Sequence, residues 1–378
     1  MTSTHTLIIG ASAAGLASAA CLQKAGIQYL LIEKQLHVAH HWRNHYDRLH
    51  LHTNKSLSHL PFVPFDKSVP KYPSRDQVVA YLEQYALKMD IHPVFNTEVL
   101  SVKRENGVWV TRTNGETYQS ENVIMATGAT HTPKMATFPG LETFPGSVLH
   151  SALYKNGKAF SGKQVLVVGF GNSGGEQAID LHEHGAHPAL SVRSAVNVIP
   201  RDIFGISALQ IGVLMNGRLS PKQSDALNAP LIRLLVGDLN KLGLKKAADG
   251  PLVQIQKYGR IPLLDIGTLK LIRQGHIRVF DGIERIEGST VHFKNGKSSP
   301  FDAIILATGY EHGLDKILVG VDEAVYDDLK KPSGQQVANG KDGLYFCGYY
   351  TSPTGMLRDM GFAAQRIAGE IAAASLKK

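Results

Sequence analysis

Apolar residues occur in short runs of strand length, and the first run leads into a glycine-rich turn and a helical pattern. Residues 6–9 form this run, and small and apolar residues continue at helical spacing over residues 14–25. Gly26 follows the helical pattern, which suits the residue after a helix end, and residues 28–32 are the next apolar run. Because strands that alternate with helices pair as parallel neighbours, this stretch predicts an α/β fold.

The same succession returns in the middle of the chain. Residues 165–168 are apolar, glycines follow at Gly169, Gly171 and Gly174, and residues 189–192 form the next apolar run after a helical pattern. A second α/β unit of the same kind is therefore predicted to begin near residue 157.

A helix and a β-meander are predicted between the two glycine-rich turns. Ser74 and Gln77 fit a capping box, and apolar residues follow at helical spacing. After residue 95, turn sequences at 105–107 and 114–115 separate strand-like runs, the last of which ends in Ala-Thr-Gly at 126–128.

The second half of the chain repeats part of this order. Residues 302–309 form another apolar strand that ends in Ala-Thr-Gly, and the chain returns to the first unit through residues 343–348 and a helix at 361–373. Residues 204–260 interrupt the second unit, with Ser220-Pro221 as a helix start. This insertion is predicted to form helices that cover cofactors or line a substrate pocket; an amphipathic membrane contact is the alternative.

Residues 37–59 contain seven histidines. A metal site is one interpretation, but no cysteine accompanies the histidines and no His-x-x-x-His pair lies on a clear helix. At period two, the leucines at 49 and 51 share one face, and the other face carries Arg48, His50, His52 and Asn54. We therefore expect no metal, and an extended segment whose polar face lines a ligand cavity.

Composition narrows the class of protein. The 378 residues suffice for two compact domains, and 43% hydrophobic with 19% charged residues is typical of globular chains. The two cysteines, Cys21 and Cys347, form no Cys-x-x-Cys, which indicates a reducing compartment and no redox dithiol. No apolar run reaches the roughly 18 residues of a membrane span, and the strand at residue 6 leaves no room for a signal peptide. We expect a cytoplasmic protein.

The net charge of +8 raises the question of nucleic acid. The chain has no dense block of lysine and arginine and no interleaving of aromatic and basic residues, so no nucleic-acid partner is expected. The basic field instead favours phosphate-bearing cofactors and anionic substrates.

The N-terminal turn has the chemistry of a dinucleotide site. In Gly-x-Gly-x-x-Gly, the first glycine turns the chain, the second lets backbone approach a pyrophosphate, and the third lets helix pack on strand. Here Ser12 takes the second position between Gly10 and Gly15, so its side chain must turn away from the ligand. Glu33 ends the next strand, 23 residues after Gly10, where an acid accepts hydrogen bonds from ribose hydroxyls. A strand–turn–helix without a ligand is the alternative, and Glu33 argues against it.

The second glycine-rich turn differs from the first in the charge of the residue that ends the next strand. Arg193 stands 24 residues after Gly169, close to the spacing of Glu33, and Ser194 follows it. An acid here would repel a ribose 2′-phosphate, whereas Arg193 with Ser194 would bind one. The first unit is therefore expected to take FAD and the second NADPH; a merely solvated arginine is the alternative reading.

Residues 144–154 carry a more specific signal. Phe144, Gly146, His150 and Tyr154 match the Phe-x-Gly-x-x-x-His-x-x-x-Tyr fingerprint of class B flavin-containing monooxygenases, which the chain resembles. The related Baeyer–Villiger enzymes usually have Trp where this chain has Tyr154. Further stretches resemble the YUCCA-type flavin monooxygenases, namely 46–52, 171–174, 192–194, 198–202 and 261–268. The chain departs from that branch at Ser12 and at Thr53-Asn54-Lys55, where Leu-Pro-Lys is common.

The resemblance implies two Rossmann-like dinucleotide-binding domains, with the NADPH domain inserted into the FAD domain. The expected bounds are 1–155 and 301–378 for the FAD domain and 156–300 for the NADPH domain. It also implies a cycle in which NADPH reduces FAD and a C4a-(hydro)peroxyflavin then transfers one oxygen atom from O2 to a small organic substrate. YUCCA-type enzymes act on α-keto acids, but this chain leaves α-keto acid, sulfide, amine and ketone open. A flavin-dependent NADPH reductase or oxidase without oxygen transfer, and a non-catalytic NADPH-binding protein, are the alternatives; the oligomeric state, including a homo-oligomer, is left open.

Site residues follow from the motifs and the resemblance together. The polar groups expected to stabilise the oxygenating flavin are Asn54, His52 and Asn172. The residues expected to bind FAD are Gly10, Ser12, Ala14, Gly15, Glu33, Lys34, Trp42, Val99, Ala126, Thr127, Gly128 and Gly348. Those expected to bind NADPH are Gly169, Gly171, Asn172, Ser173, Gly174, Arg193, Ser194, Arg201, Ala307, Thr308 and Gly309.

Overall fold

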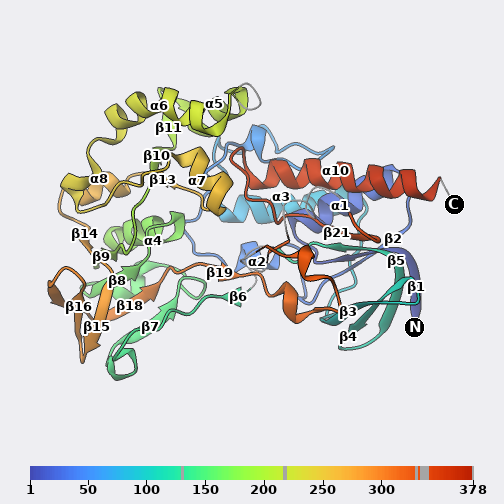
Figure 1. Cartoon of the computed structure of the whole chain (residues 1–378), viewed down its shortest axis with the longest axis horizontal. Helices are drawn as coiled ribbons and strands as arrows, with labels where there is room; N and C mark the ends of the chain where they lie inside the picture. The colour runs from blue at the N-terminus through green and yellow to red at the C-terminus, as the bar shows by residue number, and fades with distance from the viewer. Residues whose placement is uncertain (129–131, 216–218, 328–330, 333–339, 377–378) are drawn as a thin grey trace. The chain divides into compact units, whose positions relative to one another are not determined.

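The chain divides into two compact units in a computed structural model (Figure 1). The structure describes residues 1–128, 132–215, 219–327, 331–332 and 340–376. Unit 1 comprises residues 1–43, 53–132 and 310–378, and unit 2 comprises residues 44–52 and 133–309. Each unit is built around its own sheet and its own apolar core.

Unit 1 contains a sheet in the order β2-β1-β5-β4-β3-β20, with β21 also paired to β5. Strand β1 (Thr2–Ile9) lies parallel between β2 (Tyr29–Ile32) and β5 (Thr117–Met125). The predicted meander is confirmed, because β3 (Val99–Glu105), β4 (Val108–Thr113) and β5 pair antiparallel in chain order.

Three helices pack together in unit 1. Helix α1 (Ala13–Lys24) contacts both α3 (Arg75–Lys88) and α10 (Met356–Ser375), and the three run beside the strands of the sheet in Figure 1. The capping box predicted at Ser74 is present, with the Ser74 hydroxyl accepting from the Gln77 N–H. The remaining elements of unit 1 are α2 (His40–Arg43), the 3-10 helices Lys55–Leu57, Leu314–Lys316 and Glu323–Val325, β20 (Leu318–Val319) and β21 (Leu344–Phe346). The chain leaves and re-enters this unit at β6 (Thr132–Pro133) and β19 (Tyr310–Glu311).

Unit 2 contains an all-parallel sheet in the order β14-β9-β8-β18-β7. Its strands are β7 (Ser147–His150), β8 (Gln164–Val168), β9 (His187–Ser191), β14 (Arg278–Phe280) and β18 (Ala303–Leu306). Helix α4 (Asn172–Glu183) follows β8 and buries Ala178, Ile179 and Leu181. The predicted α/β class with parallel strands is thereby confirmed for both units.

Shorter elements complete unit 2. They are the 3-10 helices Leu141–Thr143, Gly157–Phe160 and Leu239–Leu242, the strands β10 (Val198–Pro200), β11 (Asp202–Ile203), β12 (Ile206–Ser207), β13 (Leu263–Asp265), β15 (Ile283–Glu287), β16 (Thr290–Phe293) and β17 (Ser298–Pro300), and helix α8 (Thr268–Arg273).

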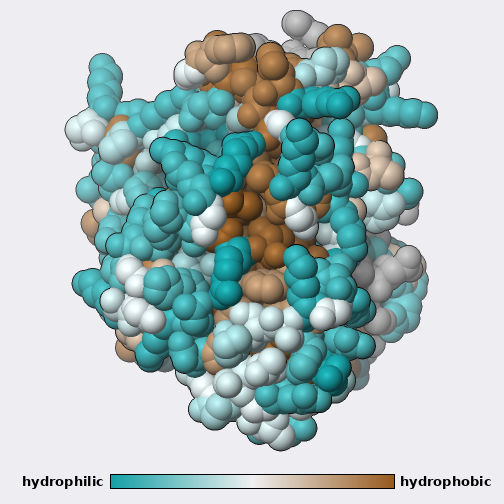
Figure 2. Space-filling view, turned by 90° about the vertical axis from the view of Figure 1, so that its left-hand side faces the viewer, coloured by the Kyte–Doolittle hydropathy of each residue, from teal (hydrophilic) through white to brown (hydrophobic). Residues whose placement is uncertain are grey.

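The insertion predicted at residues 204–260 is helical. It holds α5 (Ala208–Met215), α6 (Pro221–Val236) and α7 (Pro251–Tyr258), and Ser220 caps α6 as predicted. In Figure 2 a band of apolar side chains runs from the top of the view, where α5 and α6 lie. Large apolar side chains exposed in this part of the chain include Phe204, Ile206, Leu227, Leu234 and Leu235. No helix among the described residues is long and apolar enough to cross a membrane.

The bounds of the two units differ from the predicted 155/156 and 300/301. Strand β7 pairs with β18, so residues 147–150 form an edge of the second sheet and the chain changes unit near residue 133. Residues 44–52 also belong to unit 2, although 43 residues of unit 1 precede them. Residues 44–52 contact α4, as described below, and the Asp47 N–H donates to the Lys155 carbonyl at 2.8 Å.

Candidate functional site

The first glycine loop is tightly packed at its two ends. Gly10 has φ +105°, and a Cβ added to it would lie 2.7 Å from the Ala126 carbonyl oxygen. A Cβ added to Gly15 would lie 1.8 Å from the Gly10 carbonyl oxygen. Both glycines are therefore required by close backbone packing, since any side chain would collide with main-chain atoms.

Ser12, the departure from the expected motif, is compatible with this loop. It is the N-cap residue of α1 with extended backbone (φ −103°, ψ −163°), which any residue adopts. Its side chain forms no capping hydrogen bond, and the first turn of α1 carries no acidic residue. The helix start therefore keeps backbone N–H groups and a positive dipole end for an anion, which fits a pyrophosphate.

Glu33 lies directly beside the first loop. The Gly10 N–H donates to the Ile32 carbonyl at 2.8 Å, and Glu33 Oε2 accepts from the Ala11 N–H at 2.7 Å. Glu33 Oε1 accepts from the Gln35 N–H at 3.0 Å. Each carboxylate oxygen can accept a further hydrogen bond, so the group is fixed next to the loop and fits a ribose hydroxyl.

The structure brings part of the predicted FAD set to this loop. Gly348 has φ +89°, and a Cβ added there would lie 3.1 Å from the Ala14 Cβ, at the start of α1. Val99 instead pairs with Thr113 at the start of β3. The residues that contact the Glu33 backbone are Val94 and Thr97, which sequence reasoning missed.

Other members of the set lie at the strand end or elsewhere. Thr127 Oγ1 and Tyr349 Oη are 2.5 Å apart just past β5. Trp42 is half-buried in α2, and Gly128 has φ +83°. Lys34, the residue after Glu33, is exposed.

The second glycine loop has the same frame, by which we mean the same close packing of its outer glycines against backbone atoms. Gly169 has φ +123°, with a Cβ position 2.4 Å from the Ala307 carbonyl oxygen, and the Gly174 Cβ position is 2.5 Å from the Gly169 carbonyl oxygen. Gly171 differs, because an added Cβ would meet nothing within 4 Å and its φ is −88°. The fold does not require glycine there, so its missing side chain leaves room for a ligand at the start of α4.

Arg193 lies one residue further from the first glycine of its loop, Gly169, than Glu33 lies from Gly10. The Gly169 N–H donates to the Ser191 carbonyl at 3.0 Å, so Val192 is the counterpart of Glu33. Val192 is buried, whereas Arg193 and Ser194 are exposed. Within the described residues the Arg193 guanidinium has no hydrogen bond and no ion pair, which fits a group kept for a phosphate.

The remaining predicted NADPH residues lie around this loop. Asn172 Oδ1 accepts from the Leu264 N–H at 2.8 Å and ties the start of α4 to β13. Arg201 pairs with Asp202 at 3.2 Å. The Ala307 N–H donates to Val168 at 2.9 Å, as the Ala126 N–H does to Ile9 at 2.9 Å. The Thr308 hydroxyl donates to the Lys134 carbonyl, and Gly309 has φ +84°.

Asn54 lies in unit 1 next to the start of α10. Its Oδ1 accepts from the Leu57 N–H at 3.1 Å and from the Ser56 hydroxyl at 2.7 Å. Both contacts use Oδ1, so the amide Nδ2 is the half of the side chain that can donate to a ligand. A Cβ added to Gly355, the N-cap residue of α10, would lie 3.0 Å from Thr53 Cγ2. The sequence placed this helix start at residue 361 and therefore missed a second helix N-terminus beside Asn54.

Residues 44–52, which we name the strap, do not form the predicted extended segment. The Leu49 N–H donates to the Tyr46 carbonyl at 3.2 Å in a turn. His52 Nε2 lies 2.5 Å from Glu176 Oε1, and Arg48 forms a bidentate pair with Glu183 at 2.8 Å. Two residues of the predicted polar face, Arg48 and His52, therefore contact α4. No three His, Cys, Asp or Glu side chains gather as metal ligands in the described part of the chain.

The four fingerprint residues all belong to unit 2. Phe144 packs in the core, and a Cβ on Gly146 would lie 2.1 Å from the Asp302 carbonyl oxygen. The His150 Nε2 contacts the Gly309 carbonyl at 3.0 Å, and burial lowers the pKa of this imidazole. The Tyr154 hydroxyl donates to Asp180 Oδ2 at 2.5 Å. The fingerprint thus joins β7, the second Ala-Thr-Gly and α4.

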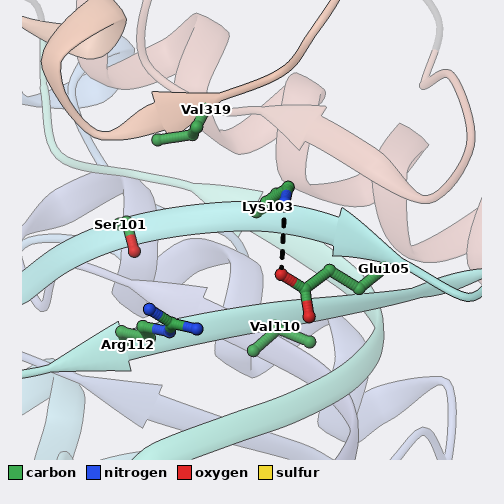
Figure 3. A pocket seen from close by; sticks show the side chains of 6 residues that line it. All are labelled: Ser101, Lys103, Glu105, Val110, Arg112 and Val319. Carbon is green, nitrogen blue, oxygen red and sulfur yellow. Dashed lines mark ion pairs between the residues drawn. The ribbon is translucent and has the colours of Figure 1, made fainter.

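A polar groove lies on the β3 and β4 face of unit 1 (Figure 3). Its lining residues are Ser101, Lys103, Glu105, Val110, Arg112 and Val319, and Lys103 pairs with Glu105 at 3.4 Å. None of them comes from a glycine loop, so this groove is not the candidate site.

Sequence comparison decides the family. The chain is 39% identical over 91% of its length to the probable indole-3-pyruvate monooxygenase YUCCA3 of Arabidopsis thaliana, covering 81% of that protein. It is 42% identical over 82% of its length to Arabidopsis thaliana indole-3-pyruvate monooxygenase YUCCA6, covering 77% of it. The chain belongs to the YUCCA family of monooxygenases. The predicted resemblance is confirmed.

A broader family model and solved structures agree with this YUCCA member. Residues 7–201 match the pyridine nucleotide-disulphide oxidoreductase family. A flavin-containing monooxygenase from Stenotrophomonas maltophilia has a TM-score of 0.76 at 20% identity, over 99% of this chain and 100% of that one. A bacillithiol disulfide reductase from Staphylococcus aureus has a TM-score of 0.71 at 17% identity, over 99% of both chains. The fold is thus common to monooxygenases and reductases, and the sequence relatives distinguish them.

Proposed function

We propose that this YUCCA member is an FAD- and NADPH-dependent monooxygenase that acts on an α-keto acid, with indole-3-pyruvate as the first candidate. The observation that carries the cofactor assignment is the contrast between two loops of one frame. Glu33 places a carboxylate beside the first loop, and Arg193 places beside the second a guanidinium that has no hydrogen bond or ion pair in the part of the chain that the structure describes. The substrate candidate comes from the names of relatives that share 39% and 42% of aligned residues.

Each part of the two sites has a defined task in this proposal. The N-termini of α1 and α4 hold the two pyrophosphates, Glu33 accepts from the FAD ribose, and Arg193 with Ser194 binds the 2′-phosphate of NADPH. Asn54 donates from Nδ2, because Oδ1 is occupied by the cap of residues 55–57. The flavin, reduced by NADPH, supplies the activation of oxygen, so the protein needs no nucleophile of its own.

A reductase is the second candidate, since a disulfide reductase shares the fold. The thiols argue against dithiol chemistry, because burial raises the pKa of Cys21 to about 12 and that of Cys347 to about 11. Thiols that stay protonated are poor nucleophiles and poor redox centres. Both cysteines are free and buried, which also supports our proposal of a cytoplasmic location.

The test follows NADPH oxidation and product mass together. Purified protein is expected to be yellow and to consume NADPH faster with indole-3-pyruvate in air, giving indole-3-acetate. A matched series with a sulfide, an amine and a ketone reports the substrate class. Substrate-stimulated turnover that persists under nitrogen, or protein that stays colourless after FAD is added, would refute the proposal.

A further inference from the structure

Helix α4 carries an acidic face immediately after the second glycine loop. Glu176, Asp180 and Glu183 follow one another at spacings of four and three residues and therefore share this face. Glu176 is 2% exposed and Asp180 is 3% exposed. A buried carboxylate needs a partner, because leaving it unpaired in a low dielectric costs far more than pairing it.

Each of these carboxylates meets a side chain from outside the helix. Asp180 accepts from the Tyr154 hydroxyl at 2.5 Å, and Glu183 pairs with Arg48 at 2.8 Å. Glu176 meets His52 at 2.5 Å, with the Tyr46 phenol facing the same carboxylate. The strap therefore supplies the partners of Glu176 and Glu183.

Besides His52, the carboxylate of Glu176 has the phenol of Tyr46 as a neighbour. Glu176 Oε2 and His52 Nδ1 are both buried and have no hydrogen-bond partner among the described residues. Among the described residues, the imidazole makes the 2.5 Å hydrogen bond to this carboxylate, and the Tyr46 phenol is its second neighbour. Arg48–Glu183 differs, because the Glu183 side chain is 50% exposed and water screens it.

The position of Glu176 gives the pair a consequence for ligand binding. Glu176 lies three residues after Ser173, which is just under one helical turn, or about 4.5 Å along the axis. The side chains of Ser173 and Glu176 are also both neighbours of the Tyr46 hydroxyl. A negative charge here opposes the positive dipole end that would hold a pyrophosphate.

We infer that His52 is a positioning residue for NADPH: it compensates the buried Glu176 carboxylate, so that the start of α4 accepts the pyrophosphate of the cofactor. This inference rests on the proposed function of unit 2. It gives His52 a task in cofactor binding through Glu176, separate from contact with the flavin or the substrate.

The test measures NADP⁺ affinity of the FAD-loaded protein by isothermal titration calorimetry. His52→Leu is expected to weaken NADP⁺ binding about tenfold, because Glu176 loses its partner and its charge then acts on the loop. The double variant His52→Leu, Glu176→Gln is expected to recover affinity to within about threefold, since the uncompensated charge is gone. His52→Gln, which keeps a side-chain donor, should lie near wild type.

Arg48→Leu is the matched control on the same strap. It removes the exposed pair seven residues further along α4, and it should change NADP⁺ affinity less than twofold. Steady-state kinetics add a second readout: His52→Leu should raise KM for NADPH more than it lowers kcat. A general folding defect would not give this pattern, nor would it be reversed by Glu176→Gln.

The outcomes separate the two proposals. Wild-type protein that binds no NADP⁺ would refute the proposed function of unit 2. Wild-type binding with unchanged affinity in His52→Leu, or a double variant as weak as the single one, would overturn the role of His52. If His52→Leu does not fold, Glu176→Gln alone decides, because the inference requires it to bind NADP⁺ at least as tightly as wild type.

Discussion

The two glycine loops are built on one frame and differ in what surrounds them. In each, the first glycine N–H donates to the end of the neighbouring strand, at 2.8 Å for Gly10 and 3.0 Å for Gly169. In each, the first glycine packs on the alanine of an Ala-Thr-Gly, Ala126 or Ala307, which explains why that tripeptide occurs twice. The outer glycines are therefore a requirement of the fold.

The two loops differ at the middle position of the glycine motif and at the end of the strand that follows the helix. Ser12 and Gly171 have nearly the same extended backbone, which accepts either residue. Glu33 has a buried valine, Val192, as its counterpart, and the charge of the second unit comes one residue later at Arg193. Ligand preference thus depends on positions where the packing of the loop does not restrict the residue type.

The largest effect is expected from breaking the frame. Gly15→Ala places a methyl 1.8 Å from the Gly10 carbonyl and should destabilise unit 1 by about 3 kcal/mol or more, with loss of bound FAD. Denaturant unfolding and flavin absorbance measure both. Gly171→Ala is the matched control, expected to cost under about 1 kcal/mol because its methyl meets nothing within 4 Å, while NADP⁺ binding weakens. Equal destabilisation by the two substitutions would contradict the distinction between outer and middle glycines.

Arg193→Ala tests the charge difference between the loops. It should weaken NADPH binding by about 10- to 100-fold and leave NADH nearly unchanged, since a charge-assisted bond to phosphate is worth about 1.5–3 kcal/mol. Dissociation constants for both nucleotides, measured side by side, give the result. Arg285→Ala, which removes an exposed pair with Glu287, is the control arginine. A similar loss for NADH and NADPH would show that Arg193 does not read the 2′-phosphate.

The two Ala-Thr-Gly ends differ in their response to pH. Burial lowers the pKa of His150, which holds the Gly309 carbonyl, so protonation favours the unfolded chain. Its contribution is complete above the unfolded value of about 6.5 and is lost as pH falls below it. We expect the free energy of unfolding to decline as the pH falls below about 6.5, and His150→Gln to flatten that decline.

The control lies at the first Ala-Thr-Gly. There Thr127 meets Tyr349, and burial raises the pKa of that phenol far above this range. Tyr349→Phe should therefore leave the slope of stability against pH as it is. If His150→Gln leaves the slope of stability against pH unchanged, a group other than His150 causes the pH dependence.

The smallest effect is expected at Ser12. Ser12→Gly should change the free energy of unfolding by a few tenths of a kcal/mol, because the side chain forms no capping bond. FAD affinity should stay equal or increase slightly, measured by fluorescence of released flavin. A loss of stability near that of Gly15→Ala would mean that the serine side chain carries part of the frame.

Local patterns were predictable, and contacts between distant residues were not. The Ser74 cap, the meander and the helical insertion depend on neighbours within a few residues, so spacing and turn chemistry suffice for them. The extended conformation predicted for the strap was wrong, because its alternation of polar and apolar residues is typical of a strand. The contact of His52 with Glu176 joins residues 124 positions apart, so no local pattern indicates it. The start of α10 was missed because Gly355 has no side chain that signals a cap.

The sequence by itself determined the repeated strand–glycine–helix units, the family and the difference in charge between Glu33 and Arg193. Those features are carried by residue types at short spacing, where covalent geometry and hydrogen bonding leave few solutions. Only the tertiary structure decided that Val192 is the counterpart of Glu33, that the fingerprint strand is an edge of the second sheet, and that the strap binds α4. Register and burial of charge depend on which distant segments meet, and a buried carboxylate such as Glu176 selects its partner in space.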